Sequence, residues 1–247
     1  MKAIVRKLVQ RILGPGLYEY VATIRNIRHR KRHDPPSTCP ACGYVGWFRP
    51  YGSQMRAKAL CPGCGGVERH RLFYLYAMQN GQNKLTGKSI LHFAPEQFLI
   101  DLTKSSKEYI TADIKAPDVD HHLDIISLPF EDARFDIVIC NHVLEHVPDD
   151  YKALRELHRV LRTAGTAILT VPMIHEWADT YEDASITGPV ARKAHFGEWD
   201  HLRYYGRDFV KRVERAGFSV ETFQAQPSDC VKFSLIRGET IFIGKKA

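Results

Sequence analysis

The sequence contains no apolar run long enough to cross a membrane. A membrane-spanning helix needs about 20 consecutive apolar residues, and no stretch of this 247-residue chain approaches that length. Residues 1–11 also lack the apolar core and small-residue cleavage site of a secretory signal. We therefore expect a cytoplasmic protein, and a hydrophobic content of 44% suffices for one substantial domain with a small appendage.

Acidic residues are almost missing from the N-terminal arm. Residues 1–33 hold nine Lys and Arg residues against Glu19 alone, so this arm carries a net charge of +8 and the rest of the chain −1. Residues 2–13 place apolar side chains at helical spacing opposite basic ones, a pattern typical of a helix on an anionic membrane surface. The same pattern fits a helix packed on the protein itself or on a second copy. We predict a basic helical arm and linker over residues 1–36, and the near-neutral body makes nucleic acid a less favoured partner.

Cysteines are few, and four of the six occur in two C-x-x-C pairs. Eighteen residues separate the pair Cys39 and Cys42 from the pair Cys61 and Cys64. This spacing is typical of a zinc ribbon, in which four thiolates surround one ion, and a glycine after each pair permits the tight turn. Since four cysteine ligands close the coordination shell, we expect a structural zinc in residues 37–66. Redox-active cysteine pairs are the alternative.

From residue 86 onward, strand-like and helix-like segments alternate, which predicts an α/β fold with a doubly wound, mostly parallel sheet. A helix over residues 67–85 connects it to the ribbon, with residues 69–71 bridging the two parts. An insertion at residues 174–206 is long enough to form a lid. The expected strands are 89–93, 109–113, 135–140 and 166–171, followed by an antiparallel pair at 218–223 and 233–243.

The buried strand at 135–140 ends abruptly in polar residues. Asn141, His142, Glu145 and His146 follow it directly, and in open α/β sheets ligands bind at the carboxyl ends of the strands. If residues 142–146 form a helical turn, His142, Glu145 and His146 share one face and converge on one point. This point is the candidate active centre.

Four segments give residues 86–247 a resemblance to the type 11-like class I S-adenosylmethionine-dependent methyltransferases, which have a Rossmann-like fold. They are Asp113 at the end of the second strand, the segment beginning at Asp124, the strand and turn at 135–146, and residues 157–165. The resemblance implies S-adenosylmethionine as the cofactor. It also implies that Asp113 holds the ribose hydroxyls and that Asp124 reaches the adenine amine.

The loop after the first strand departs from the family's Gly-x-Gly-x-Gly pattern. The resemblance places His92, Ala94, Glu96 and Asn141 beside the cofactor, but Ala94 and its neighbours lack the backbone freedom of glycine. We expect binding to be retained, because both aspartates are in place, with Glu96 accepting a hydrogen bond from the cofactor's ammonium group. If binding is lost, the chain is a non-catalytic binding or scaffold protein.

The histidine-rich centre favours methylation of a hydroxyl on a small molecule or glycan. Some class I O-methyltransferases hold a metal through a Glu-x-x-Glu-His motif at this point, which implies a second divalent metal on His142, Glu145, His146 and His201. Such a metal lowers the pKa of an acceptor hydroxyl. Without it, His142 is the best general base, since an imidazole pKa of about 6.5 suits proton removal at neutral pH. The remaining histidines considered are expected to be surface or structural residues: His121, His122, His158 and His175.

The same features allow two other functions, a zinc protease and an RNA methyltransferase. The letters His142-x-x-Glu-His146 also match an inverted zinc-protease motif, but that motif requires a long helix and here follows a buried strand and precedes Pro148. An RNA methyltransferase that uses the zinc ribbon to bind RNA is the stronger rival, although the near-neutral body argues against it.

Overall fold

A computed structural model of the chain describes residues 35–52, 55–80, 85–96 and 99–247. The basic helix predicted at residues 2–13 lies outside these ranges and stays a prediction. Among the helices that are described, none is both long and apolar enough to cross a bilayer. The domain boundaries proposed from the sequence also remain predictions.

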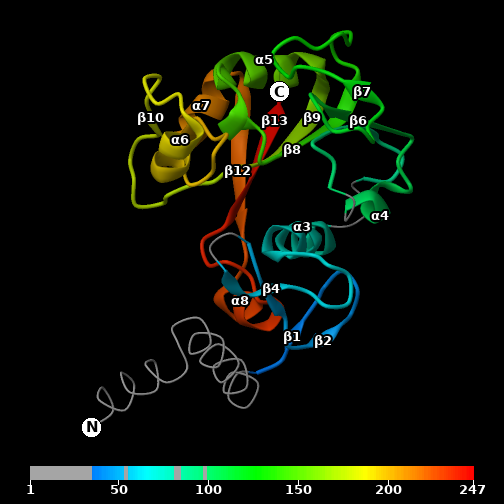
Figure 1. Cartoon of the computed structure of the whole chain (residues 1–247). Coiled ribbons are helices and arrows are strands. Elements are labelled where there is room, and N and C mark those ends of the chain that lie inside the picture. Colours follow the sequence, from blue (N-terminus) through cyan, green and yellow to red (C-terminus); the bar gives the residue numbers. More distant parts are fainter. Residues whose placement is uncertain (1–34, 53–54, 81–84, 97–98) are drawn as a thin grey trace.

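A seven-stranded sheet forms the centre of the molecule (Figure 1). The strand order is β12-β13-β9-β8-β5-β6-β7, and β13 is antiparallel to both of its neighbours while the other adjacent strands run parallel. This arrangement confirms the predicted doubly wound, mostly parallel α/β fold. The strands are β5 (Ser89–Phe93), β6 (Glu108–Asp113), β7 (His121–His122), β8 (Phe135–Asn141), β9 (Leu161–Thr170), β12 (Phe218–Gln224) and β13 (Thr240–Lys246).

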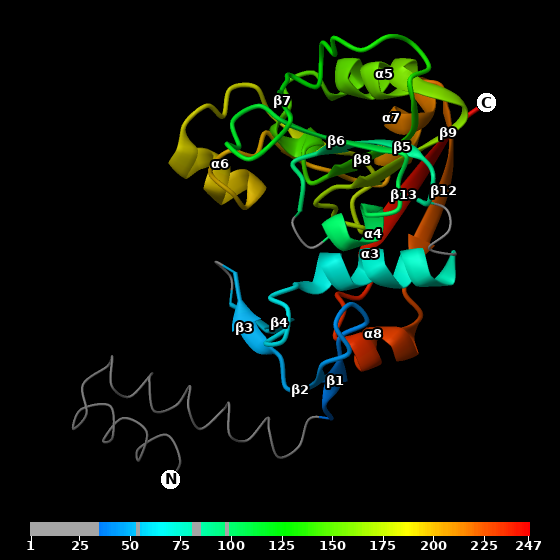
Figure 2. The ribbon, with the colours of Figure 1, turned by 90° about the vertical axis from the view of Figure 1, so that its right-hand side faces the viewer.

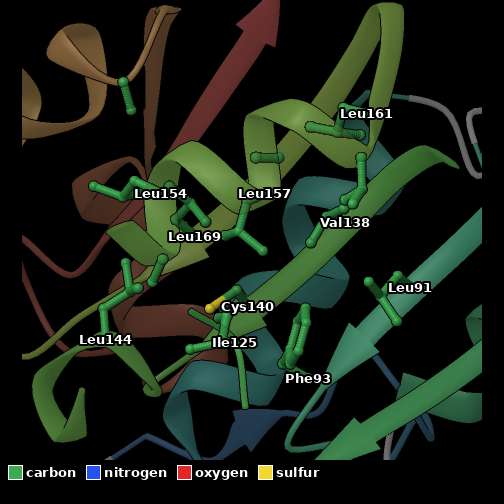
Figure 3. Close-up of a cluster of buried hydrophobic side chains, with 14 of the residues drawn as sticks. Leu91, Phe93, Ile125, Val138, Cys140, Leu144, Leu154, Leu157, Leu161 and Leu169 are labelled. Carbon is green, nitrogen blue, oxygen red and sulfur yellow. The ribbon is translucent and has the colours of Figure 1, made fainter. Parts of the chain in front are cut away.

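Strand β8 is buried on both faces because its apolar side chains alternate between two cores. Val138 and Cys140 face α5 (Asp150–Val160), where they meet Leu154 and Leu157 (Figure 3). Ile139 belongs to the opposite core, together with residues of α3 (Glu68–Gln79). Burial on both faces accounts for the continuous apolar run in the sequence.

The ribbon region consists of two short antiparallel hairpins that precede α3. One pairs β1 (Ser37–Thr38) with β2 (Val45–Gly46), and the other pairs β3 (Arg49–Tyr51) with β4 (Arg56–Leu60). Helix α3 lies between this region and the sheet (Figure 2). Helix α8 (Pro227–Phe233), which joins β12 to β13, contacts β1. The ribbon region is therefore packed on two helices of the larger fold.

The last strand starts later than the sequence predicted, since the expected strand covered residues 233–243. Residues up to Phe233 form α8, and β13 starts only at Thr240. Pro227 at the first turn favours a helix start, and Ser234 ends the helix in a left-handed conformation. The first predicted helix of the sheet domain is also shorter than expected, since α4 covers only Ile100–Thr103 among the described residues.

Arg71 joins the ribbon region to the rest of the protein, as the sequence predicted for this segment. Its side chain is fully buried. The guanidinium donates hydrogen bonds to the carbonyls of Ala59 and Gly66 on one side, at 2.8 and 2.9 Å, and of Phe233 and Ser234 on the other, at 2.8 and 2.6 Å. One side chain thus satisfies backbone acceptors from segments more than 160 residues apart.

The predicted lid region contains a small hairpin and a helix: β10 (Tyr181–Glu182), α6 (Pro189–Phe196) and β11 (Arg203–Tyr204). The buried guanidinium of Arg203 donates to the carbonyls of Leu144 and Val147, at 2.9 and 2.6 Å. The amide of Leu202 donates to the carbonyl of Glu145 at 2.8 Å. These bonds fasten the base of the lid to the turn after β8.

Candidate functional site

The carboxyl ends of β5, β6 and β8 open onto a cleft of about 530 Å³. Ala94, Asp113, Asp124, His142 and His146 all line it, so the fold gathers residues that the sequence analysis selected from separate segments. The lid adds Arg192, Trp199 and Asp200 to its walls. The cleft therefore joins the predicted cofactor residues to the candidate active centre.

Asp113 and Asp124 each use one carboxylate oxygen to hold the local backbone. Asp113 Oδ1 accepts from the amides of Lys115 and Ala116, at 2.7 and 2.8 Å, and Asp124 Oδ1 accepts from the amide of Ile126 at 3.1 Å. These bonds orient both carboxylates at the cleft. Each has a second oxygen with which it could accept hydrogen bonds from a ligand.

The loop after β5 follows a glycine-like path without a glycine. Ala94 has a φ of +47°, in the left-handed region, and its amide donates to the carbonyl of Ala112 at 2.9 Å. Left-handed backbone costs an alanine about 1–2 kcal/mol. The expectation that Ala94 could not reproduce this backbone freedom is therefore corrected, since the surrounding contacts hold the strained conformation.

Glu96 has a different environment from the predicted one. Its Oε1 accepts from Arg69 Nε at 2.6 Å and lies 2.8 Å from His70 Nε2, while its Oε2 accepts from Asn141 Nδ2 at 3.3 Å. Burial alone would raise the pKa of Glu96, but the His70 hydrogen bond and the positive charge of Arg69 lower it to about 2. Because both oxygens are already engaged, Glu96 is not the free acceptor expected for an ammonium group. It ties α3 to the end of β8.

His92 does not line the cleft, which corrects its predicted contact with the cofactor. The side chain is fully buried, with Nδ1 2.8 Å from the hydroxyl of Tyr109. Burial lowers the pKa of His92 to about 4, so the ring is neutral at pH 7. Its position in the middle of the sheet makes it a structural residue.

The turn after β8 is not the helical turn predicted from the sequence. His142 has a φ of +52°, and only Leu144–His146 form a short 3₁₀ helix, η3. Positive φ values at residues other than glycine concentrate at functional sites. His142, Glu145 and His146 therefore do not share one helical face, yet His142 Nδ1 still lies 3.3 Å from Glu145 Oε1.

Glu145 is a buried carboxylate whose two oxygens have no hydrogen-bond partner among the described residues. Its side chain is only 1% exposed, and its close ionic neighbour is His142. Burial alone would lower the pKa of His142, but the negative charge of Glu145 beside it raises that pKa above the usual value. The Nε2 atom of His142 is buried and without a partner in the described structure. An unsatisfied buried carboxylate is costly and indicates that the site binds something more.

His201 from the lid lies against the turn. Its ring stands edge to face with that of His146, with centroids 4.8 Å apart. Glu145, His146 and His201 each offer a ligand atom within 4.8 Å of the others. His142 does not belong to this group, so the structure brings together three of the four predicted ligands. His201 Nδ1 lies 3.1 Å from the carbonyl oxygen of Phe196. If Nδ1–H donates a hydrogen bond to that oxygen, the lone pair of Nε2 is available to bind a metal.

The four ribbon cysteines converge. The Sγ atoms of Cys39 and Cys64 lie 3.7 Å apart, as do those of Cys42 and Cys61. A tetrahedral zinc with Zn–S bonds of about 2.3 Å has sulfur atoms about 3.8 Å apart. The two knuckles are closed identically, by the bonds Gly43 N–H to Cys39 O and Gly65 N–H to Cys61 O, with both glycines at positive φ. The donor set and its geometry fit zinc.

A second cavity, of about 240 Å³, is also lined by His142. It is lined by the segment after β9 and by the turn before β13, and it includes Glu239 and His175. Sequence reasoning assigned His175 to the surface or to a structural role and did not select Glu239. No local signal marks either residue, because the two segments meet only through the pairing of β9 with β13.

The strand order and the cleft define the fold class as that of the Rossmann-like methyltransferases. The YcgJ protein of Bacillus subtilis shares this fold at 15% identity, with a TM-score of 0.50 over 72% of this chain and 98% of that protein. An S-adenosylmethionine-dependent methyltransferase from Mesorhizobium loti also shares it at 15% identity, with a TM-score of 0.51 over 71% of this chain and 98% of that protein. At this identity the likeness shows the fold alone.

Sequence comparison adds a family match. Residues 85–169 match the methyltransferase domain family. The chain is 33% identical over 110 residues to a demethylmenaquinone methyltransferase of Staphylococcus aureus, covering 39% of this chain and 46% of that protein. It is 28% identical over 123 residues to the mitochondrial 2-methoxy-6-polyprenyl-1,4-benzoquinol methylase of Rattus norvegicus, covering 44% and 37%. The chain thus spans less than half the length of these relatives, and the family match and the fold together support a methyltransferase.

Proposed function

We propose that the protein transfers a methyl group from S-adenosylmethionine to a hydroxyl of a small molecule or glycan. The observation that carries this proposal is the shared cleft, in which Asp113 and Asp124 face the same space as His142. The aspartates would hold the ribose and adenine of the cofactor. The histidine would then lie on the acceptor side.

The pair formed by His142 and Glu145 supports a role in proton removal. Because Nδ1 faces the carboxylate, the proton of a neutral ring is held on Nδ1 and the lone pair of Nε2 remains available. When bound, S-adenosylmethionine supplies an electrophilic methyl group. As the acceptor oxygen bonds to that methyl carbon and the carbon–sulfur bond breaks, His142 Nε2 would take the hydroxyl proton, leaving S-adenosylhomocysteine and a methyl ether.

Cofactor binding is the first test. Wild-type protein should release or absorb heat on titration with S-adenosylmethionine, and Asp113→Asn should bind about 10–100-fold more weakly, because a charge-assisted hydrogen bond contributes about 1.5–3 kcal/mol. Asp118→Asn, an exposed aspartate in the loop after β6, should bind like wild type. If wild type gives no heat and no thermal shift, the non-catalytic scaffold replaces the enzyme.

The group of Glu145, His146 and His201 supports a second way to activate the hydroxyl. Its donor set of two imidazoles and one carboxylate suits zinc, iron or manganese, and the unpartnered oxygens of Glu145 fit a bound cation. Such a metal would lower the pKa of the acceptor hydroxyl. The four cysteines would hold a separate structural zinc.

Metal analysis separates these sites. Wild-type protein should contain two metal ions per chain by mass spectrometry, and His201→Ala should contain one. His195→Ala, which alters an exposed histidine of the same lid segment, should retain two. A wild-type value of one would assign the metal to the cysteines alone and leave His142 as an unassisted base. An unchanged value in His201→Ala would reject His201 as a ligand.

The relatives named as quinone and quinol methylases favour small-molecule acceptors over RNA. Binding of RNA that weakens steeply with salt would reverse this preference. Attachment to a membrane surface through residues 2–13 and a cytoplasmic location remain proposals from the sequence.

A further inference from the structure

The second cavity touches the same histidine as the cofactor cleft. His142 lines both spaces, so the two spaces adjoin at this residue. A methyl group carried in the first space would be transferred toward a molecule in the second. Two cavities that adjoin at a candidate base suit a donor site and an acceptor site.

Two buried polar atoms border this second cavity without a partner among the described residues. They are His142 Nε2 and Glu239 Oε2. Burial raises the pKa of Glu239 to about 7, against the opposing charges of His142, Arg69 and Arg56, while Glu68 raises it further. Buried polar atoms without partners are rare in native proteins. Their position at one cavity indicates that a ligand supplies the missing hydrogen bonds.

The turn before β13 holds Glu239 in place. Gly238 adopts a φ of +82°, and its carbonyl accepts from Thr240 Oγ1 at 2.9 Å and from Gln224 Nε2 at 3.4 Å. A side chain at position 238 would be strained at this φ, whatever space surrounds it. The turn that carries the Glu239 carboxyl group is thus held in place directly before β13.

Arg237, His175 and Thr240 also line the cavity, and its other walls are apolar, formed by Val171, Pro172, Met173, Ile236 and Phe242. Apolar walls with a small number of oriented polar groups are typical of small-molecule sites. A glycan, with polar groups on every side, would leave many of its hydroxyls unpaired against these walls. The apolar part of the lining therefore favours a compact molecule with an apolar ring.

We propose that this cavity is the acceptor subsite and that Glu239 binds a second hydroxyl of the acceptor while the reacting hydroxyl faces His142. The inference rests on the proposed methyl transfer and narrows its acceptor to a small apolar ring with at least two hydroxyl groups. Glu239 is then a residue that selects the acceptor and does not itself take part in the transfer.

The three dihydroxybenzenes test this subsite, with phenol as the probe that lacks the second hydroxyl. Binding to the full-length chain saturated with S-adenosylhomocysteine can be measured by ligand-observed NMR. At least one isomer should bind wild type about 10-fold or more tightly than phenol, since leaving a buried carboxyl group without a hydrogen-bond partner costs about that factor. Glu239→Ala should bring that isomer to the level of phenol, while Glu221→Ala, an exposed glutamate on β12, should not.

Glu239→Gln keeps the shape of the side chain but removes its carboxyl group. The thermal midpoint of each variant shows whether it is folded. Glu239→Gln should weaken the preferred isomer and leave phenol unchanged. If no isomer binds wild type better than phenol, or if Glu239→Ala leaves the preference intact, the subsite is wrong. Calorimetry with S-adenosylhomocysteine should be unaffected by both substitutions. A chain that binds a dihydroxybenzene through Glu239 but no S-adenosylhomocysteine would keep the subsite and remove the methyltransferase function.

Discussion

Replacing His142 by Asn is expected to lower kcat for hydroxyl methylation by about 10²–10⁴-fold, the contribution typical of a positioned general base. Asparagine tolerates the left-handed backbone of this position better than alanine, so the variant removes the base with little added strain. Affinity for S-adenosylmethionine should change little, because Asp113 and Asp124 remain. Initial rates with radiolabelled S-adenosylmethionine and calorimetry on the same preparation measure the two quantities.

His121→Ala is the matched control, because His121 is exposed on β7 and lies outside the lining of the cleft. It should retain wild-type rates. A His142→Asn enzyme with kcat within threefold of wild type would remove the general base from the mechanism. If the same protein held a metal at Glu145, His146 and His201, the metal would then be the group that activates the hydroxyl.

Replacing Arg71 by Met is expected to lower the free energy of unfolding by about 3–5 kcal/mol, in the range of the most damaging single substitutions. Methionine fills much of the same volume but cannot donate, so the carbonyls of Ala59, Gly66, Phe233 and Ser234 lose their shared donor in a buried site. Urea denaturation followed by circular dichroism gives the change. Retention of zinc reports whether the ribbon region survives.

Arg215→Met is the control for this substitution. Arg215 is an exposed arginine at the end of α7 (Phe209–Arg215) that bonds one tyrosine hydroxyl. Its replacement should change stability by no more than about 0.5 kcal/mol. An Arg71→Met protein within 1 kcal/mol of wild type would show that the ribbon region is held by its apolar contacts alone.

The ribbon region is also connected to the functional site through α3. Arg69 and His70 lie in the first turn of this helix, shortly after the second cysteine pair in the sequence, and bind Glu96 in the loop after β5. Glu96 in turn holds Asn141, the last residue of β8. Arg69 and His70, which directly follow the ribbon region in the sequence, therefore help to hold the glycine-poor loop in its conformation.

Local patterns determined the parts of this protein that depend on short stretches of chain. The apolar run of β8 predicted a strand buried on both faces, and the two C-x-x-C pairs predicted four convergent thiols. Asp113 and Asp124 were placed correctly at the cleft because the carboxyl ends of parallel strands meet at one edge of a sheet. Each of these predictions follows from a short sequence motif or from the general geometry of a parallel sheet.

Only the tertiary structure decided which distant residues complete the site. The left-handed backbone of His142 takes it off the predicted helical face, because the bond from its amide to the carbonyl of Thr170 fixes the turn at the edge of β9. Arg71 finds an acceptor on α8, and the pairing of β13 with β9 brings Glu239 to the same cavity as His142. These contacts join segments far apart in sequence, and no periodicity or local motif records them, since they are set by how the elements pack.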